Sequence, residues 1–224
     1  MTARRSFLTR VGAAAAAITL GSATASAGRP LDAPDGAARP DTARARWQPA
    51  RDPKDDWFDQ LPGKHRLFFD ALTAQGTSAA MGFADNYFTG SKDGYGLEDG
   101  DLALVICLRH MATPFAFADV FWAKYGAALG DSLKFNDPKT SQAPVVNVYT
   151  ARLDALVKRG MHFAVCDMAS HRFAGAIARS VDGNVDAIYT EMRAHVVGNA
   201  HFVAAGIIAV NRAQERGYSI AYTG

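Results

Sequence analysis

Two cysteines are the side chains of this 224-residue chain best suited to nucleophilic chemistry, and their sequence surroundings differ. Cys166 ends an apolar run and stands shortly before a segment, residues 170–181, that predicts a helix. The N-terminus of a helix stabilises a thiolate, which is the nucleophilic form of cysteine. Cys107 lies within the nearly continuous apolar run 101–109, so we expect it to be an inert core residue. The sequence therefore predicts Cys166 as the catalytic residue.

Two other interpretations of Cys166 stay open at this stage. The thiol could be a small buried apolar side chain, because free cysteine is among the most buried residue types. It could also form a disulfide with Cys107 if the protein reaches an oxidising compartment. The position of Cys166 at the end of its predicted strand favours the reactive thiol, since Cys107 lies in the middle of its own strand.

Further site residues follow from the rule that open parallel sheets bind ligands beyond the carboxyl ends of their strands. We expect the strands 101–109, 161–165 and 194–198 to deliver side chains to that edge. The residues so predicted are His110, Met111 and Thr113, then Cys166, Asp167 and Ser170, and finally Asn199 and His201.

Groups near the cysteine in sequence could tune the thiol. These are Asp167, His171 and Arg172, with ordinary helix-start and surface roles as the alternative. An acid beside a thiol raises the pKa of that thiol, so Asp167 is expected to oppose the effect of the helix.

A metal site is the alternative use of several of these residues. Soft and imidazole ligands for copper, zinc or haem could come from His110, Met111, Cys166, His195 and His201. No compact spacing such as HExxH or paired CxxC occurs, so we predict no metal and no organic cofactor.

Two other patterns predict structure and no chemistry. Gly94, Gly96 and Gly100 precede a strand, whereas a phosphate-binding loop must follow one and open a helix. Aromatic residues recur at near-helical spacing between residues 117 and 125, which is typical of core or subunit-interface packing, with a small-ligand pocket as the alternative.

The elements that must position these residues alternate between strand and helix. The expected strands are 65–72, 101–109, 161–166, 194–198 and 218–222, and residues 145–149 are either a short strand or a lead-in. The expected helices run from Thr77 and Ser78 to Phe88, from Thr113 and Pro114 to Leu129, and over 151–159, 170–181 and 200–215. Glycine-rich residues 90–100 and polar residues 131–144 are expected to be loops. This alternation predicts an α/β fold, a three-layer α/β/α arrangement around an open, mainly parallel sheet of about five strands.

The N-terminal region predicts an export signal and a linker. Arg4 and Arg5 precede Phe-Leu, a short apolar run and Ala25-Ser26-Ala27, which resembles a twin-arginine (Tat) signal peptide over residues 1–27. Residues 28–60 are rich in proline in their first part and predict a linker or surface arm, followed by one folded domain over 61–224. We therefore expect a periplasmic protein with no membrane insertion after the signal is removed.

The charge balance argues against nucleic-acid binding. The chain holds 24 Lys and Arg against 22 Asp and Glu, and three of those arginines belong to the signal segment. Neither an excess of basic side chains nor a basic stripe remains to attract phosphate backbones or anionic membranes.

The C-terminal third resembles the DsrE/DsrF/TusD-like (DsrE family) sulfur-relay proteins. The resemblance is specific over residues 162–169 (HFAVCDMA), 205–210 (AGIIAV) and 214–218 (QERGY), and it extends in outline over residues 62–224. It implies that Cys166 carries sulfur as a persulfide, that a thiol or sulfur-carrier protein is the partner, and that the protein is a homo-oligomer.

The chain also departs from that family. Its relay proteins work in the cytoplasm, whereas this chain carries an export signal, and the segments 114–125 and 131–144 are additions to the minimal domain. Fold is therefore implied more strongly than function, and whether the protein is an enzyme stays open. A non-catalytic small-ligand-binding or assembly module and a metal-binding periplasmic protein are the alternatives.

Overall fold

The computed structural model describes residues 48–224, so the predicted signal peptide and residues 28–47 of the predicted linker lie outside the described part. Five parallel strands form one sheet in the order β4-β3-β2-β1-β5. The strands are β1 (His65–Ala71), β2 (Leu102–Leu108), β3 (His162–Cys166), β4 (Ala200–Val203) and β5 (Ser219–Tyr222). The predicted α/β class and five-stranded parallel sheet are confirmed.

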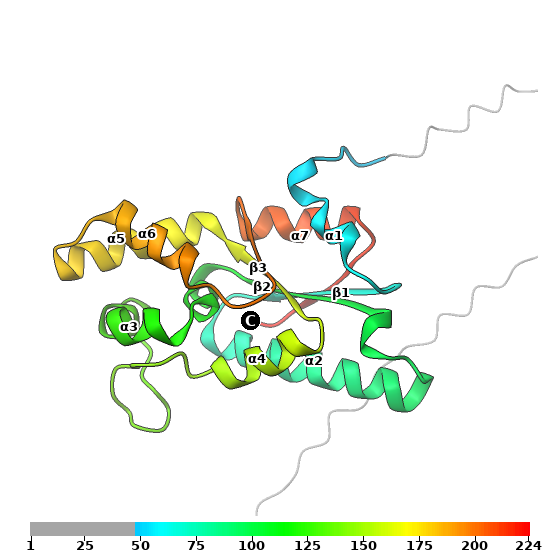
Figure 1. Cartoon of the computed structure of the whole chain (residues 1–224), viewed down its shortest axis with the longest axis horizontal. Helices are drawn as coiled ribbons and strands as arrows, with labels where there is room; N and C mark the ends of the chain where they lie inside the picture. The colour runs from blue at the N-terminus through cyan, green and yellow to red at the C-terminus, as the bar shows by residue number, and fades with distance from the viewer. Residues whose placement is uncertain (1–47) are drawn as a thin grey trace, which may run out of the picture. The chain divides into compact units, whose positions relative to one another are not determined.

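Helices cover both faces of the sheet (Figure 1). The helices are α1 (Trp57–Gln60), α2 (Ala74–Tyr95), α3 (Asp119–Leu133), α4 (Thr150–Lys158), α5 (Asp167–Val181), α6 (Val185–Ala194) and α7 (Gly206–Glu215). Helices α2 and α4 pack on one face, and α1 and α7 pack on the other. The strand order explains this division. The right-handed crossovers from β1 through β4 all run in one direction along the sheet, so their helices stay on one face. The connection from β4 to β5 runs in the opposite direction, so α7 lies on the other face.

A third apolar cluster lies beyond the sheet and holds several aromatic side chains. Phe117, Phe121, Trp122 and Tyr125 are buried there against α5 and α6, which confirms that this aromatic pattern builds core. The indole of Trp122 donates a hydrogen bond to the Pro114 carbonyl oxygen at 3.1 Å. The cluster fixes α3, α5 and α6 as one unit beside the sheet (Figure 1).

The predicted strand at 194–198 is wrong. Helix α6 ends at Ala194 and the strand is Ala200–Val203, so α7 begins at Gly206 and not at residue 200. The apolar pair after α6 makes only an isolated antiparallel bridge, between Val196 and Phe117. The sequence interpretation assigned no element to residues 185–193, although they belong to a helix that buries Ile188 and Met192.

Several helix boundaries also differ from those predicted. Thr73, and not Thr77, caps α2, since its hydroxyl oxygen accepts a hydrogen bond from the Gly76 amide at 2.9 Å. That helix continues through the expected glycine loop and ends where Gly96 adopts a left-handed φ of 67°. The Thr113-Pro114 segment is a 3₁₀ helix (His110–Ala116), and α3 begins at Asp119 and runs to Leu133, inside the expected loop at 131–144.

Residues 145–149 form no strand in the described chain. Instead Asn147 is buried and its side-chain amide donates hydrogen bonds to the Phe115 and Phe117 carbonyl oxygens at 2.8 and 2.9 Å. The segment before α4 is therefore hydrogen-bonded to the backbone of Phe115 and Phe117 in the third apolar cluster. None of the helices described, over residues 48–224, combines the length and apolar character needed to cross a bilayer.

The segment before the sheet, residues 51–60, packs on the domain, and we call it the arm. It holds a short 3₁₀ helix (Pro53–Asp55) and α1, and the side chain of Phe58 is fully buried. The Tyr218 hydroxyl donates a hydrogen bond to the Phe58 carbonyl oxygen at 2.8 Å. The folded unit thus begins before residue 61.

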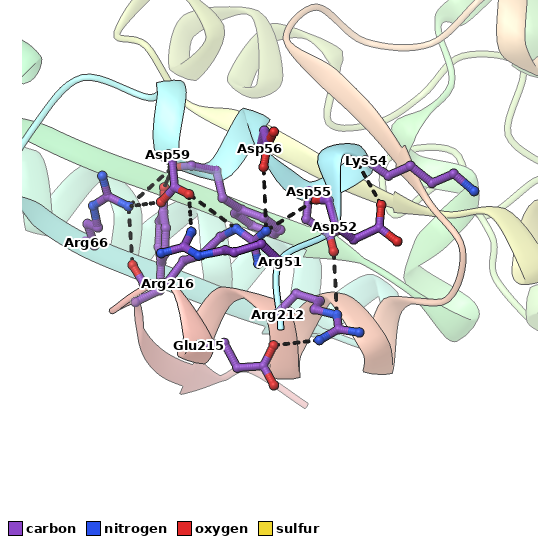
Figure 2. A network of polar contacts seen from close by, with 12 residues as sticks. Arg51, Asp52, Lys54, Asp55, Asp56, Asp59, Arg66, Arg212, Glu215 and Arg216 are labelled. Carbon is purple, nitrogen blue, oxygen red and sulfur yellow. Dashed lines mark hydrogen bonds and ion pairs between the residues drawn. The ribbon is translucent and has the colours of Figure 1, made fainter. Parts of the chain in front are cut away.

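Ion pairs hold the arm against α7 and the sheet (Figure 2). The side chain of Arg216 is 1% exposed, with its Nε 3.5 Å from an Asp59 carboxylate oxygen. Arg66 reaches the same carboxylate at 3.3 Å, and Arg212 lies 3.5 Å from Asp55. The acidic arm therefore neutralises basic side chains that lie on β1, on α7 and just after it.

Candidate active site

Cys166 lies at the carboxyl edge of the sheet, where β3 ends and α5 begins. Helix α5 starts at Asp167 and not at residue 170, so Cys166 is its N-cap residue. The Ser170 hydroxyl donates a hydrogen bond to the Cys166 carbonyl oxygen at 3.0 Å and fixes the first turn. Cys166 therefore stands at the N-terminal end of α5, the end of a helix that carries partial positive charge.

The thiol lies in a cleft of about 260 Å³ between the starts of α5 and α7. Cys166 is a buried residue with 7% of its surface exposed, and it is one of the residues that line this cleft. The residues that line the cleft come from three strand-to-helix connections. They are Arg109, His110, Cys166, Met168, Ala169, Arg172, Ala205, Gly206 and Ile207. In residues 48–224 neither helix start carries a side-chain cap, and the Met168 amide at the start of α5 donates a hydrogen bond to the Ala204 carbonyl oxygen at 3.4 Å.

Two arginines line the cleft, and only one of them is paired with a carboxylate. Arg109 is held by a bidentate ion pair, with its Nε and Nη2 donating to the Asp70 carboxylate at 2.6 and 2.9 Å. Arg172 contacts the His110 carbonyl oxygen at 3.3 Å and the Met111 sulfur at 3.8 Å. Within the described residues Arg172 pairs with no carboxylate, so its positive charge is free for an anion.

Gly206 is required where α7 approaches β2. A Cβ built on Gly206 would lie 2.4 Å from Cβ and 2.6 Å from Cδ of Arg109. The absence of a side chain at this position lets the arginine pass beside the helix start and reach Asp70. This close approach shapes one wall of the cleft.

Cys107 is inert, as predicted. It is fully buried, and burial, reinforced by the nearby Asp70 carboxylate, raises the pKa of its thiol well above the ordinary value. Its sulfur lies 3.9 Å from the Gly206 carbonyl oxygen. Both cysteines are free, and the strand register sets Cys107 opposite Ala164, two residues from Cys166. No disulfide joins them in the structure.

The remaining predicted residues divide by position. His110 lines the cleft, and Met111 touches Arg172 beside it. Thr113 and Ser170 are fully buried and hydrogen bond to backbone carbonyl groups, of Leu108 and Cys166 respectively, so they support the site without lining it.

Asp167 and His171 face α6 and not the thiol. The Asp167 carboxylate accepts a hydrogen bond from the Tyr189 hydroxyl and lies 3.6 Å from Arg193. The ring of His171 stacks on Tyr189 with a centroid distance of 3.8 Å. The contacts of the Asp167 carboxylate are therefore with Tyr189 and Arg193 on α6.

Asn199 and His201 lie at the opposite edge of the sheet, so their predicted place in the site is wrong. The cause is the misplaced strand: Asn199 and His201 stand at the amino end of β4, whereas Cys166 pairs with Val203 at its carboxyl end. The Asn199 amide donates to the Met161 carbonyl oxygen at 3.1 Å.

The metal-ligand set considered from the sequence is scattered. His110 and Cys166 line the cleft, whereas His195 follows α6, where its carbonyl oxygen accepts a hydrogen bond from the Ala118 amide at 2.8 Å. Among residues 48–224 no three His, Cys, Asp or Glu side chains gather as a metal-binding group.

His201 instead forms a pair with His162 beside the arm. Nδ1 of His162 and Nε2 of His201 lie 2.9 Å apart, and the Trp57 indole stacks on His201 at 3.9 Å. Burial, together with His162, lowers the pKa of His201 to about 4. Burial also lowers the pKa of His162.

This pair predicts a loss of stability in mild acid. The unfolded chain has an ordinary histidine pKa of about 6.5, so it takes up the proton first as the pH falls. The free energy of unfolding should therefore decline from about pH 6.5 down to about pH 4. Urea unfolding at several pH values measures it, and His201→Gln should show a shallower decline; an identical pH profile would contradict the assignment.

Six lining residues of the cleft were not among the predicted site residues: Arg109, Met168, Ala169, Ala205, Gly206 and Ile207. Arg109 was placed inside a strand, and Ala205 and Gly206 inside a helix that begins later. The available signal was chemical: an arginine at the end of an apolar strand must reach solvent or a buried acid. Arg172 was considered as a thiol-tuning group, and the structure places it on the cleft wall.

Comparisons with known proteins identify no family. No protein-family model matches the chain, and no curated protein matches it. Among solved structures, the chain is similar to MTH1491 from Methanobacterium thermoautotrophicum, described as a protein of unknown function, with 13% sequence identity and a TM-score of 0.41. The match covers 71% of this chain and 99% of that chain, and it carries no argument about function.

Proposed function

We propose that the protein is a sulfur carrier or transferase in which Cys166 accepts a sulfane sulfur and holds it as a persulfide. The observation that carries this proposal is a free thiol that lines a cleft together with Arg172, at the start of a helix. A cysteine sealed in the core, as Cys107 is, could not do this chemistry.

The reaction needs no organic cofactor and no external oxidant. The Cys166 thiolate attacks a terminal sulfane sulfur of a polysulfide, a new Sγ–S bond forms, and the shortened polysulfide leaves with the electrons of the broken S–S bond. With thiosulfate the leaving group is sulfite. An acceptor thiolate then attacks the outer sulfur of the persulfide and releases the Cys166 thiolate.

The cleft favours the anions of this cycle. The thiolate, the persulfide and the leaving group all carry negative charge, and the start of α5, the start of α7 and Arg172 offer positive potential. Membership of the DsrE family, Tat export to the periplasm, a thiol or sulfur-carrier partner and a homo-oligomeric state belong to the same proposal. They rest on the residues and motifs quoted from the sequence.

Mass spectrometry of the intact protein tests the proposal. After incubation with polysulfide the chain should gain about 32 Da, and a thiol reductant should remove it. Cys166→Ser should gain nothing, whereas Cys107→Ser should gain sulfur like the parent. No gain in the parent, or an equal gain in Cys166→Ser, would refute the persulfide. Tight binding of a small anion that survives Cys166→Ser would instead support a non-catalytic binding module.

Arg172 should matter most for an anionic donor. Arg172→Met should slow persulfide formation from thiosulfate by about tenfold, because a charge-assisted contact of roughly 1.5 kcal/mol is lost. Arg179→Met, in the last turn of the same helix, is the matched control. Mass spectrometry of reaction samples quenched at successive times gives the rates. Equal rates for both variants would contradict a role of Arg172 in donor binding.

A further inference from the structure

We propose that a cavity at the amino edge of the sheet binds an uncharged, planar aromatic small molecule that carries hydrogen-bonding groups. The cavity has a volume of about 630 Å³, against about 260 Å³ for the cleft beside Cys166. It lies between the start of β1 and the C-terminal half of α2, whereas Cys166 ends β3 at the opposite edge. The proposal is therefore independent of the persulfide chemistry.

The end of α2 builds one side of this cavity. Gly96 adopts a left-handed φ of 67° and ends the helix. The Leu97 amide then donates a hydrogen bond to the Ser91 carbonyl oxygen at 3.2 Å, which turns the chain. Leu97 packs against the core and lines the cavity together with His65, the first residue of β1. A strand start and a capped helix end thus form the cavity, and such elements hold a site more firmly than a loop does.

Two aromatic side chains and one glycine of α2 line the cavity. Tyr87 and Tyr95 stand eight residues apart, about 12 Å along the helix axis, and Gly90 lies between them. A Cβ built on Gly90 would meet no atom within 4 Å, so this stretch of the helix surface is open. The side chain of Tyr95 packs little on the protein, because the residue is 82% exposed. A planar aromatic ligand over Gly90 would stack on a tyrosine face and cover it.

The polar side chains of the cavity are available to a ligand. Within residues 48–224 the side chains of His65, Asn86 and Ser91 make no hydrogen bond, and the two tyrosine hydroxyls make none either. Ser91 is the most informative of these residues, because it is only 8% exposed and its hydroxyl still has no partner there. Buried hydroxyls are usually hydrogen-bonded, so a polar group of the ligand would supply the missing bond.

The charge of the lining selects against ions. Among the residues of the described chain that line this cavity there is no Asp, Glu, Lys or Arg. An ionised ligand would lose its hydration without gaining an ion pair. The cleft beside Cys166 differs, since Arg172 lines it. The volume of the cavity falls within the range of about 300–1,000 Å³ that is typical of small-molecule sites.

The test titrates 2-quinolone, an uncharged bicyclic lactam, into the full chain labelled with ¹⁵N. We expect a dissociation constant of about 1 mM or lower, with amide shifts confined to His65 and residues 86–97. Gly90→Leu should weaken binding at least about tenfold, because the added side chain enters the cavity. Gly94→Leu is the matched control and should bind like the parent. Gly94 lies on the same helix outside the lining, and a Cβ there also meets no atom within 4 Å.

Quinoline-2-carboxylate presents the same ring system with a negative charge, and it should bind at least about tenfold more weakly than 2-quinolone. Absence of saturable 2-quinolone binding, unchanged affinity in Gly90→Leu, equal affinity for the carboxylate, or amide shifts centred on Cys166 would each overturn the site. Self-association of the parent that Gly90→Leu abolishes would replace the ligand site by a subunit interface. If Gly90→Leu does not fold, the shift maps of the parent with the two compounds decide alone.

Discussion

Replacing Asp70 by leucine should lower the free energy of unfolding by about 3 kcal/mol. The Asp70 carboxylate is buried beneath the cleft and holds Arg109 through two hydrogen bonds of 2.6 and 2.9 Å. Without it the guanidinium, which is only 19% exposed, keeps its charge with no partner in a largely dry site. The partial exposure of Arg109 places the effect at the low end of the range for buried pairs. Urea unfolding of the full chain measures the loss.

The double variant Asp70→Leu with Arg109→Leu separates the loss of the ion pair from the cost of leaving one charge without its partner. Removing both charges leaves two apolar side chains near Cys107, and such replacements are commonly neutral or stabilising. We therefore expect each single variant to be less stable than the double variant. Additive losses would mean that the two side chains act independently and that the pair does not organise the wall of the cleft.

The Asp70–Arg109 pair also shows what the sequence could and could not predict about the site. The apolar runs of β1, β2 and β3 predicted their strands within one or two residues, because buried parallel strands leave a continuous apolar signal. That signal placed Cys166 correctly at the carboxyl edge. It said nothing of Arg109, since a pair formed between two strands depends on register, which local sequence does not encode.

In the region after α5, the local sequence predicted a strand that does not form. Val196 and Val197 look like a strand in isolation, but α6 already fills that part of the fold and leaves them one bridge to Phe117. The true strand, β4, is short and half-buried, and it contains His201 and begins beside Asn199, so its apolar signal is weak. Moving the strand by a few residues transferred both side chains to the other edge of the sheet. Tertiary packing decided this segment, and local propensity did not.

Phe58→Ala should lower the free energy of unfolding by about 3–5 kcal/mol. The ring is fully buried among Phe68, Tyr218 and the residues of α7, with a centroid distance of 5.5 Å to the Tyr218 ring. Its removal leaves a cavity where the arm meets the sheet. Urea unfolding gives the loss of stability, and hydrogen exchange of residues 51–60 should show the arm opening first.

Phe83→Ala is the matched control, because its ring is 52% exposed on α2 and should change stability by no more than about 0.5 kcal/mol. A loss below about 1 kcal/mol for Phe58→Ala would show that the arm is a dispensable covering. The ion pairs do not by themselves decide how much the arm contributes to stability. Exposed pairs such as Arg212 with Asp55 contribute little, and Arg216 stays buried only while the arm is in place. The contribution of the arm to stability should therefore depend on the buried Phe58 ring. A chain that begins at residue 61 should lose as much free energy of unfolding as Phe58→Ala does.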